Sequence, residues 1–244
     1  MQHKVLVVED DLDIAELVLV HLKELSLDVE HVIDGESAMA KLMQGYYDIV
    51  LLDIMLPGID GLSVCREIKS LFPQVSVVLL TSKSSEIDRV IGLEIGADDY
   101  ICKPFSYREF QARIKAQIRH IKLLNMQKQS SDTVTAQPSA LMLGALQIDT
   151  SSHEVFIDNQ IIDLTATEFD LIYFFARHPN QVFSRAQLLE SVWGYDHSGY
   201  EHTVNSHINR LRSKLGHLCQ QDIIETVWGV GYKLNAKSVQ QASL

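Results

Sequence analysis

Five residues suited to phosphoryl chemistry each follow a short apolar run. They are Glu9, Asp10, Asp53, Thr81 and Lys103. Clustered carboxylates repel one another unless protonation or a cation relieves the repulsion. Mg²⁺ prefers oxygen ligands and usually takes one or two carboxylates together with a phosphate. These residue types therefore predict a Mg²⁺ site at which phosphoryl transfer to Asp53 is stabilised by the metal and by the Lys103 ammonium.

Each of these residues has an expected role. Asp10 and Asp53 would bind the ion, with Glu9 acting through a water molecule, and the Thr81 hydroxyl would bind a phosphoryl oxygen. Two plainer interpretations stay open. Asp53 alone also fits a helix cap or a salt-bridged loop aspartate, because Asp is common in turns. Lys103 also fits a static network that only neutralises the acids.

The elements that must position these residues alternate between strand and helix. Apolar runs predict strands at 4–8, 28–33, 49–53, 75–80 and 100–102, and helices at 13–25, 35–43, 60–70, 85–95 and from 106 onward. Such alternation predicts an α/β doubly wound, five-stranded parallel sheet. Because the carboxyl ends of parallel strands meet at one edge, the five polar residues should converge there.

A polar stretch at 125–140 divides the chain. It contains Pro138, no aromatic residue and no apolar periodicity, which predicts a flexible linker. Short strands at 146–148, 154–157 and 161–164 follow, and capping boxes at 165–168 and 184–187 mark two helix starts. A third helix at 202–215 and a hairpin of strands at 223–227 and 232–234 complete the pattern. We therefore predict domains at 1–124 and 141–236, with a C-terminal tail at 237–244.

Composition limits the possible classes of protein. The 244 residues are 46% hydrophobic and carry a formal net charge of -11, which fits two domains and argues against nonspecific nucleic-acid binding. No apolar run approaches the ~18 residues of a membrane span, so we expect no membrane contact and a cytoplasmic location. The three cysteines are far apart and predict neither disulfides nor a zinc site. Cys102 leaves a redox input conceivable, although a buried strand cysteine is the commoner case.

The first half of the chain resembles the receiver domain of bacterial response regulators. The matching stretches are VVEDD at 7–11, LLDIMLPG at 51–58, LTS at 80–82 and KPF at 103–105. The resemblance implies a flavodoxin-like fold and a phosphoryl group that Asp53 accepts from a sensor histidine kinase. It also implies Mg²⁺ binding by Asp10, Asp53 and the Met55 carbonyl, and a phosphoryl group held by Lys103 and Thr81.

Further features of that family match this chain. The Lys103–Pro104 peptide is expected to be cis, and Tyr100 matches a switch aromatic that turns inward as Thr81 moves to the phosphate. A simple core aromatic is the alternative for Tyr100. The stretch at 92–100 and its neighbours resemble the face through which the OmpR/PhoB class forms active homodimers, with a solvated surface as the alternative. The predicted dimer residues are Arg89, Asp98, Asp99, Glu109 and Arg113.

The third helix of the second domain carries the argument for DNA binding. Val204, Ile208, Leu211 and Leu215 share one stripe that should face the core, while the opposite side is polar and suits a major groove. A solvated amphipathic helix would look similar. From Ser139 onward, seven Lys/Arg stand against eleven Asp/Glu, a net charge of -4, so any DNA contact must come from a local patch.

The stretches 165–179, 184–194, 203–215 and 224–232 resemble the winged-helix effector of the OmpR/PhoB class. This resemblance implies binding to double-stranded promoter DNA, with RNA polymerase as a further candidate partner. The predicted DNA-contacting residues are Arg185, Trp193, His202, Thr203, Asn205, Ser206, Asn209, Arg210, Arg212, Thr226, Trp228 and Tyr232. His202 and Trp228 stand where many members carry arginine, so we expect a smaller salt dependence. Trp228 could press on a sugar or stack at a protein interface.

The whole pattern predicts a response regulator of a two-component system, active as a homodimer. Its expected chemistry is limited to its own phosphotransfer and slow dephosphorylation, so we predict a transcription regulator and not an enzyme. Two alternatives remain. In one, the fold persists but phosphate is not the signal, and in the other the second domain binds protein instead of DNA.

Overall fold

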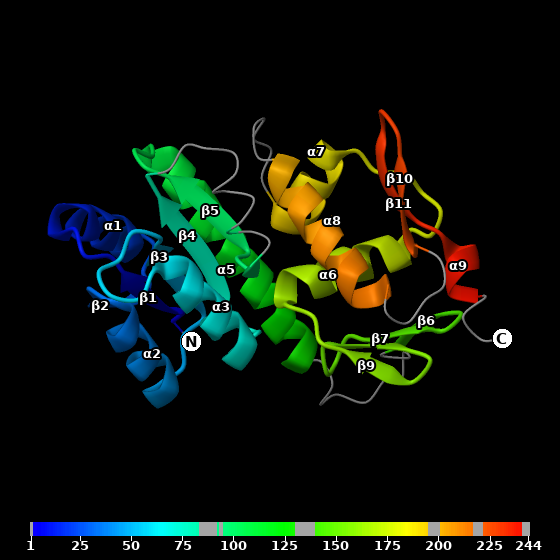
Figure 1. Ribbon diagram of the computed structural model, residues 1–244, viewed down its shortest axis with the longest axis horizontal. Helices are drawn as coiled ribbons and strands as arrows, with labels where there is room; N and C mark the ends of the chain where they lie inside the picture. Colours follow the sequence, from blue (N-terminus) through cyan, green and yellow to red (C-terminus); the bar gives the residue numbers. More distant parts are fainter. Residues whose placement is uncertain are drawn as a thin grey trace. The chain divides into compact units, whose positions relative to one another are not determined.

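The computed structural model describes residues 2–82, 92, 95–129, 140–194, 201–216 and 222–240, apart from the side chains of 120, 123–129, 201 and 240. The chain divides into two compact units, Met1–Ile118 and Arg119–Leu244 (Figure 1). The strands of the first unit are β1 (Lys4–Val8), β2 (Asp28–Val32), β3 (Ile49–Asp53), β4 (Ser76–Thr81) and β5 (Asp99–Cys102). They pair in parallel in the order β2-β1-β3-β4-β5, which confirms the predicted sheet.

Helices cover this sheet on both sides. They are α1 (Leu12–Glu24), α2 (Gly35–Gln44), α3 (Gly61–Leu71) and α5 (Tyr107–Gln129). The α1 ring of His21 lies 4.7 Å from the α5 ring of Tyr107, and α2 packs beside α3. Since strand-helix-strand crossovers are right-handed, α1 and α5 cover one face of the sheet, and α2 and α3 cover the other. The predicted helix at 85–95 lies almost wholly outside the described residues.

Side-chain capping explains why α1 begins close to its predicted start. Asp11 caps α1, because its Oδ1 accepts hydrogen bonds from the amides of Asp13 (3.0 Å) and Ile14 (3.1 Å). Strands β1, β3 and β4 are buried along nearly their whole length, as expected for a sheet covered on two faces. Their carboxyl ends therefore emerge at one edge from a rigid core.

The second unit begins with an antiparallel sheet of β6 (Ala140–Leu143), β7 (Leu146–Asp149), β8 (Glu154–Ile157) and β9 (Gln160–Ile162). Strand β6 is an addition to the three predicted strands, and it begins at the last residue of the predicted linker. Helix α5 continues over 125–129, into the other end of that stretch. Residues 130–139 lie outside the described residues.

Helices and a hairpin follow this sheet. Their bounds are α6 (Ala166–Arg177), α7 (Arg185–Leu188), a π-helical turn (Leu189–Trp193), α8 (Glu201–Gly216), β10 (Ile224–Val227), β11 (Gly231–Leu234) and α9 (Ala236–Gln240). Both predicted capping boxes are present, at Thr165 and Ser184. The apolar stripe of α8 is buried against α6 and the rest of this core, as predicted. Helix α9 lies largely in the predicted tail. Among the described residues, no helix is long and apolar enough to cross a membrane.

Candidate functional site

Three carboxylates meet at the carboxyl edge of the parallel sheet. Glu9 and Asp10 follow β1, and Asp53 is the last residue of β3. One oxygen from each lies within 4.8 Å of the others. Glu9 and Asp53 are buried, whereas Asp10 is exposed. The parallel sheet thus brings Glu9 and Asp53, which are 44 positions apart in the chain, into one acidic cluster.

Lys103 is the cation of this cluster. Its Nζ lies 2.5 Å from Glu9 Oε2 and 3.0 Å from Asp53 Oδ2. The residue directly follows β5, its amide donates to the Thr81 carbonyl (2.7 Å), and the Lys103–Pro104 peptide is cis. One ammonium therefore serves two buried carboxylates.

The raised pKa of Glu9 and its unpartnered oxygen favour the binding of a further cation. Burial raises the pKa of Glu9 to about 7, and the nearby Asp53 charge adds to this, although Lys103 opposes both. Glu9 Oε1 is buried and has no hydrogen-bond partner among the described residues. A buried orphan oxygen and three convergent carboxylates form a donor set that fits a hard divalent cation such as Mg²⁺.

The loop after β3 shapes the surroundings of Asp53. The Met55 amide donates to Asp53 Oδ1 (3.3 Å), and the Gly61 amide donates to the Ile54 carbonyl (3.0 Å). A Cβ at Gly61 would lie only 2.0 Å from the Asp53 carbonyl oxygen. Gly61, which the sequence analysis did not single out, is therefore required for the close approach of α3 to the acidic residue. The sequence alone predicts only that a helix begins at residue 60.

Thr81 and Tyr100 lie on the two strands that follow β3 in the order of the sheet. Thr81 ends β4, the strand adjacent to β3, and Tyr100 lies on β5; both are buried. Tyr100 thus points inward in this conformation. Cys102, opposite Thr81 in the ladder, is a partly buried free thiol.

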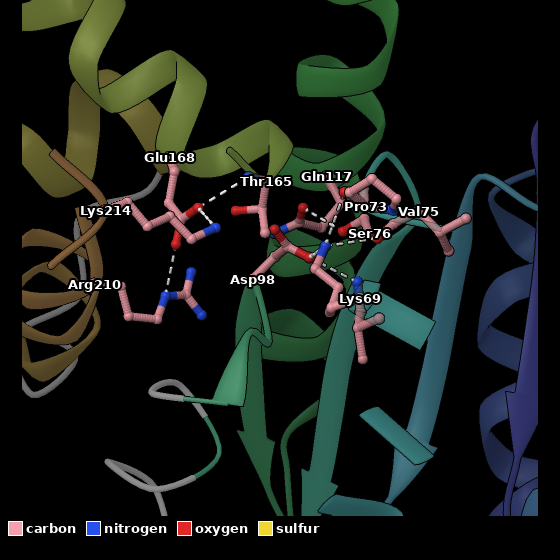
Figure 2. Close-up of polar contacts among 11 residues, drawn as sticks. Lys69, Pro73, Val75, Ser76, Asp98, Gln117, Thr165, Glu168, Arg210 and Lys214 are labelled. Carbon is pink, nitrogen blue, oxygen red and sulfur yellow. Dashed lines mark hydrogen bonds and ion pairs between the residues drawn. The ribbon is translucent and has the colours of Figure 1, made fainter. Parts of the chain in front are cut away.

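The four predicted dimer residues that the structure describes form ion pairs within the first unit. Arg113, only 2% exposed, pairs with Asp99 (2.9 Å) and with Glu109 (3.4 Å). Asp98 pairs with the buried Lys69 (2.7 Å), as Figure 2 shows. It also accepts a hydrogen bond from the Val77 amide (2.8 Å). Arg89 lies outside the described residues. Asp98, Asp99 and Arg113 therefore join elements of one chain, because burial directs each charge to its nearest internal partner.

The predicted DNA-contacting residues divide into exposed and buried groups. On α8, Asn209 is exposed, and His202, Asn205 and Arg212 are partly exposed; the neighbouring Ser213, outside the predicted set, is also exposed. The residues that the structure places in the interior or against it are Trp193, Thr203, Ser206, Arg210 and Tyr232. In this conformation these side chains pack on the core side of α8. Fewer of the predicted residues are therefore accessible to DNA than the sequence indicates.

Arg210 is held away from that surface by α6. Its Nε forms an ion pair with Glu168 Oε1 (2.9 Å), and Lys214 Nζ lies 2.8 Å from Oε2 (Figure 2). Oε2 also accepts from the Thr165 amide (2.9 Å) in the capping box. Glu168 therefore anchors α8 to α6. The sequence revealed its capping role but not its ion pairs, which join residues more than forty positions apart.

A second network joins α8 to the β10–β11 hairpin. Asn205 Oδ1 accepts from Arg185 Nε (2.8 Å) and from the Tyr232 hydroxyl (2.9 Å). Arg212 donates to the Ile224 carbonyl (2.9 Å) and to Thr226 Oγ1 (2.8 Å). These contacts join predicted residues from α7, α8 and both hairpin strands in one hydrogen-bonded network, in which the Tyr232 side chain is buried.

Comparisons with known proteins agree with this geometry. Residues 5–115 match the model of the response regulator receiver domain, and residues 158–234 match that of the transcriptional regulatory protein, C terminal. The chain belongs to the bacterial two-component response regulators of the OmpR/PhoB type, a family of transcription regulators and not of enzymes.

Particular relatives cover almost the whole chain. It is 39% identical over 243 residues to the transcriptional regulatory protein SrrA of Staphylococcus aureus, covering 98% of each chain. Among solved structures, a RitR mutant is 27% identical with a TM-score of 0.73 over 96% of this chain and 99% of that chain. DrrB of Thermotoga maritima, described as an OmpR/PhoB homolog, is 31% identical with a TM-score of 0.51 over 96% of this chain and all of that chain.

Proposed function

We propose that Asp53 accepts a phosphoryl group from a sensor histidine kinase and that this modification controls binding to promoter DNA. The contact of Lys103 Nζ with both Glu9 and Asp53 is the observation that carries the proposal. A lysine already directed at the acceptor oxygen is preorganised for the charge that phosphorylation adds.

The transfer follows from the groups around the acceptor. An Asp53 oxygen attacks phosphorus as the phosphorus–nitrogen bond to the donor imidazole breaks, and the leaving nitrogen takes a proton from solvent. Asp10, Asp53 and the Met55 carbonyl would hold Mg²⁺, with Glu9 acting through water; the ion supplies charge neutralisation at the phosphoryl oxygens. Lys103 then pairs with a phosphoryl oxygen, and the Thr81 hydroxyl donates to another, with Tyr100 turned inward.

Incubation with acetyl phosphate and MgCl₂ tests the acceptor. Intact-mass measurement should show one added phosphoryl group on the wild type and none on Asp53→Asn or after EDTA treatment. Asp28→Asn, an exposed aspartate on β2, is the matched control and should be labelled like the wild type. Equal labelling of Asp53→Asn would contradict the proposal.

We further propose that the phosphorylated receiver forms a homodimer through the face that carries β5 and α5. Glu109 is the partly exposed member of the predicted set, whereas Arg113 is committed to buried Asp99. Glu109→Lys should therefore lower the dimer fraction after phosphorylation in sedimentation velocity without unfolding the receiver. Arg108→Glu, an exposed α5 residue outside the predicted set, is the control. A dimer fraction unchanged by Glu109→Lys counts against this face.

The remaining partners follow from the same role. A DNA-binding regulator of this family would act in the cytoplasm and bind double-stranded promoter DNA as a dimer. From there it would affect RNA polymerase. Exposed polar residues of α8, Asn209 and Ser213 above all, would enter the major groove.

A further inference from the structure

A histidine on the edge strand of the parallel sheet contacts the backbone of the acidic cluster. His31 lies on β2, the first strand in the sheet order, and pairs in register with Val7 of β1. Its Nε2 lies 2.8 Å from the Glu9 carbonyl oxygen. Because a carbonyl oxygen can only accept, Nε2 carries a hydrogen and donates this bond. The imidazole thus reaches past its own ladder partner to the first residue of the cluster.

This hydrogen bond forms where the backbone ladder between β1 and β2 ends. The last paired residues are Val8 and Val32, and the Glu9 amide donates to the Val32 carbonyl (3.1 Å). The chain after β2 then turns into α2, which Asp34 caps. The His31 side chain supplies a donor to the Glu9 carbonyl at the point where β2 leaves the sheet. Both backbone groups of Glu9 are therefore held by β2.

The Glu9 carbonyl belongs to the same peptide group as the Asp10 amide. Because a peptide group is planar, a hydrogen bond to its oxygen restrains both flanking Cα atoms. On the other side of Asp10, the carboxylate of Asp11 is fixed by its bonds to the amides of Asp13 (3.0 Å) and Ile14 (3.1 Å). Asp10 therefore lies between two anchored neighbours.

The Asp10 carboxylate depends on its backbone more than the other two carboxylates of the cluster do. Lys103 Nζ contacts both Glu9 and Asp53. The exposed Asp10 carboxylate, in contrast, has no hydrogen bond or ion pair with any residue that the structure describes. One of its oxygens still lies within 4.8 Å of an oxygen of each partner. The conformation of the Glu9–Asp10 peptide must therefore supply this convergence.

We propose that His31 is a positioning residue of the cation site: its hydrogen bond to the Glu9 carbonyl holds the Glu9–Asp10 peptide so that the Asp10 carboxylate meets those of Glu9 and Asp53 at one ion. The proposal deepens the function proposed above and rests on the Mg²⁺ site within it. Hydrogen-bond partners behind metal ligands orient those ligands, and their mutation weakens metal binding. His31 acts only through the backbone and touches neither the ion nor the phosphoryl group.

Calorimetric titration of the unphosphorylated full-length protein with MgCl₂ tests the positioning directly. His31→Ala should raise the dissociation constant for Mg²⁺ roughly three- to tenfold. His31→Gln, whose side-chain amide can donate from a place similar to that of Nε2, should restore most of the affinity. Equal affinity of the wild type and His31→Ala would overturn the proposal. Absence of Mg²⁺ binding by the wild type would instead overturn the cation site of the proposed function.

A second histidine separates positioning from general stabilisation. His3 is also partly buried, and its Nδ1 lies 3.3 Å from Asp48 Oδ2. These two residues directly precede β1 and β3, so they lie at the opposite edge of the same sheet. His3→Ala should lower the free energy of unfolding in urea but leave the dissociation constant for Mg²⁺ unchanged. If His3→Ala and His31→Ala raise this constant equally, the effect is general destabilisation and the proposal is wrong.

The MgCl₂ dependence of phosphorylation supplies an independent measurement. With acetyl phosphate as the donor, His31→Ala should need roughly three- to tenfold more MgCl₂ for the half-maximal rate, yet reach the wild-type rate at saturating MgCl₂. A merely structural role for His31 would not change the half-saturating concentration. A lower rate at saturating MgCl₂ with an unchanged half-saturating concentration would therefore contradict the proposal.

Discussion

At the scale of single residues, the Lys103 ammonium neutralises part of the negative charge of the acidic cluster. Lys103 Nζ contacts both Glu9 and Asp53, and burial still raises the pKa of Glu9 to about 7. The site is therefore short of positive charge before any metal or phosphate arrives. This deficit favours cation binding, while the Lys103 ammonium and the raised pKa of Glu9 reduce the repulsion among the clustered acids.

Gly61 offers a sharp test of how tightly Asp53 is packed. In Gly61→Ala the new methyl group would lie 2.0 Å from the Asp53 carbonyl oxygen, so α3 or the end of β3 must move. We expect the free energy of unfolding of the receiver to fall by about 1–3 kcal/mol in urea denaturation, with slower phosphorylation from acetyl phosphate. Gly45→Ala, whose Cβ would meet neighbours only at 3.7 Å, should do neither. Equal stability of both variants would contradict the packing described here.

The sequence was informative about residues that terminate strands. Asp10, Asp53, Thr81 and Lys103 each follow or end an apolar run, and parallel topology alone brings such ends together. Gly61 could not be identified in the same way, because its role depends on the distance to a backbone oxygen of another element. Such distances leave no periodic signal.

At the scale of elements, Glu168 joins α6 to α8. Burial raises the pKa of Glu168, but Arg210 and Lys214 outweigh it and hold the pKa below its usual value of 4.5. A carboxyl whose folded pKa is lowered contributes stability that is present above about pH 4.5 and is lost as pH falls through the folded pKa. The effector domain should therefore lose part of its stability in acid.

The variant Glu168→Gln tests whether Glu168 links α6 to α8. It removes the ion pair that the largely buried Arg210 forms with Glu168, so we expect a loss of about 3 kcal/mol near neutral pH. The dependence on acid should also be flatter, measured by thermal unfolding at several pH values. Glu225→Gln removes a more exposed ion pair with Lys233 and should cost less than about 1 kcal/mol. If both variants lose the same stability, Glu168 is not the anchor of α8.

Features of the elements that depend on neighbouring residues were predicted from the sequence, whereas features that depend on packing between elements were not. The capping boxes at Thr165 and Ser184 marked helix starts because capping is local. The side of α8 that DNA can reach was predicted too broadly, because Arg210 and Ser206 look like surface residues until α6 and the rest of the core cover them. Strand β6 was missed because its four residues adjoin a polar stretch and pair only with β7.

At the scale of the whole molecule, the proposed function requires that a charge at Asp53 changes how the C-terminal unit binds DNA. Phosphorylation adds about -1.5 to -2 charges. A nearly complete switch between two states needs roughly 5.5 kcal/mol of differential interaction, which new contacts to Lys103, Thr81 and a bound cation would have to supply. Homodimerisation of the receivers is the proposed link between the units.

The most direct test uses a DNA duplex that the full-length protein selects from a randomised pool. The affinity of the protein for this duplex is measured before and after phosphorylation, at one fixed salt concentration. Fluorescence anisotropy should show roughly tenfold or tighter binding after treatment with acetyl phosphate and MgCl₂. Asp53→Asn, treated identically, should keep the affinity of the unphosphorylated protein. The account is contradicted if mass measurement confirms phosphorylated wild type and its affinity for DNA does not change.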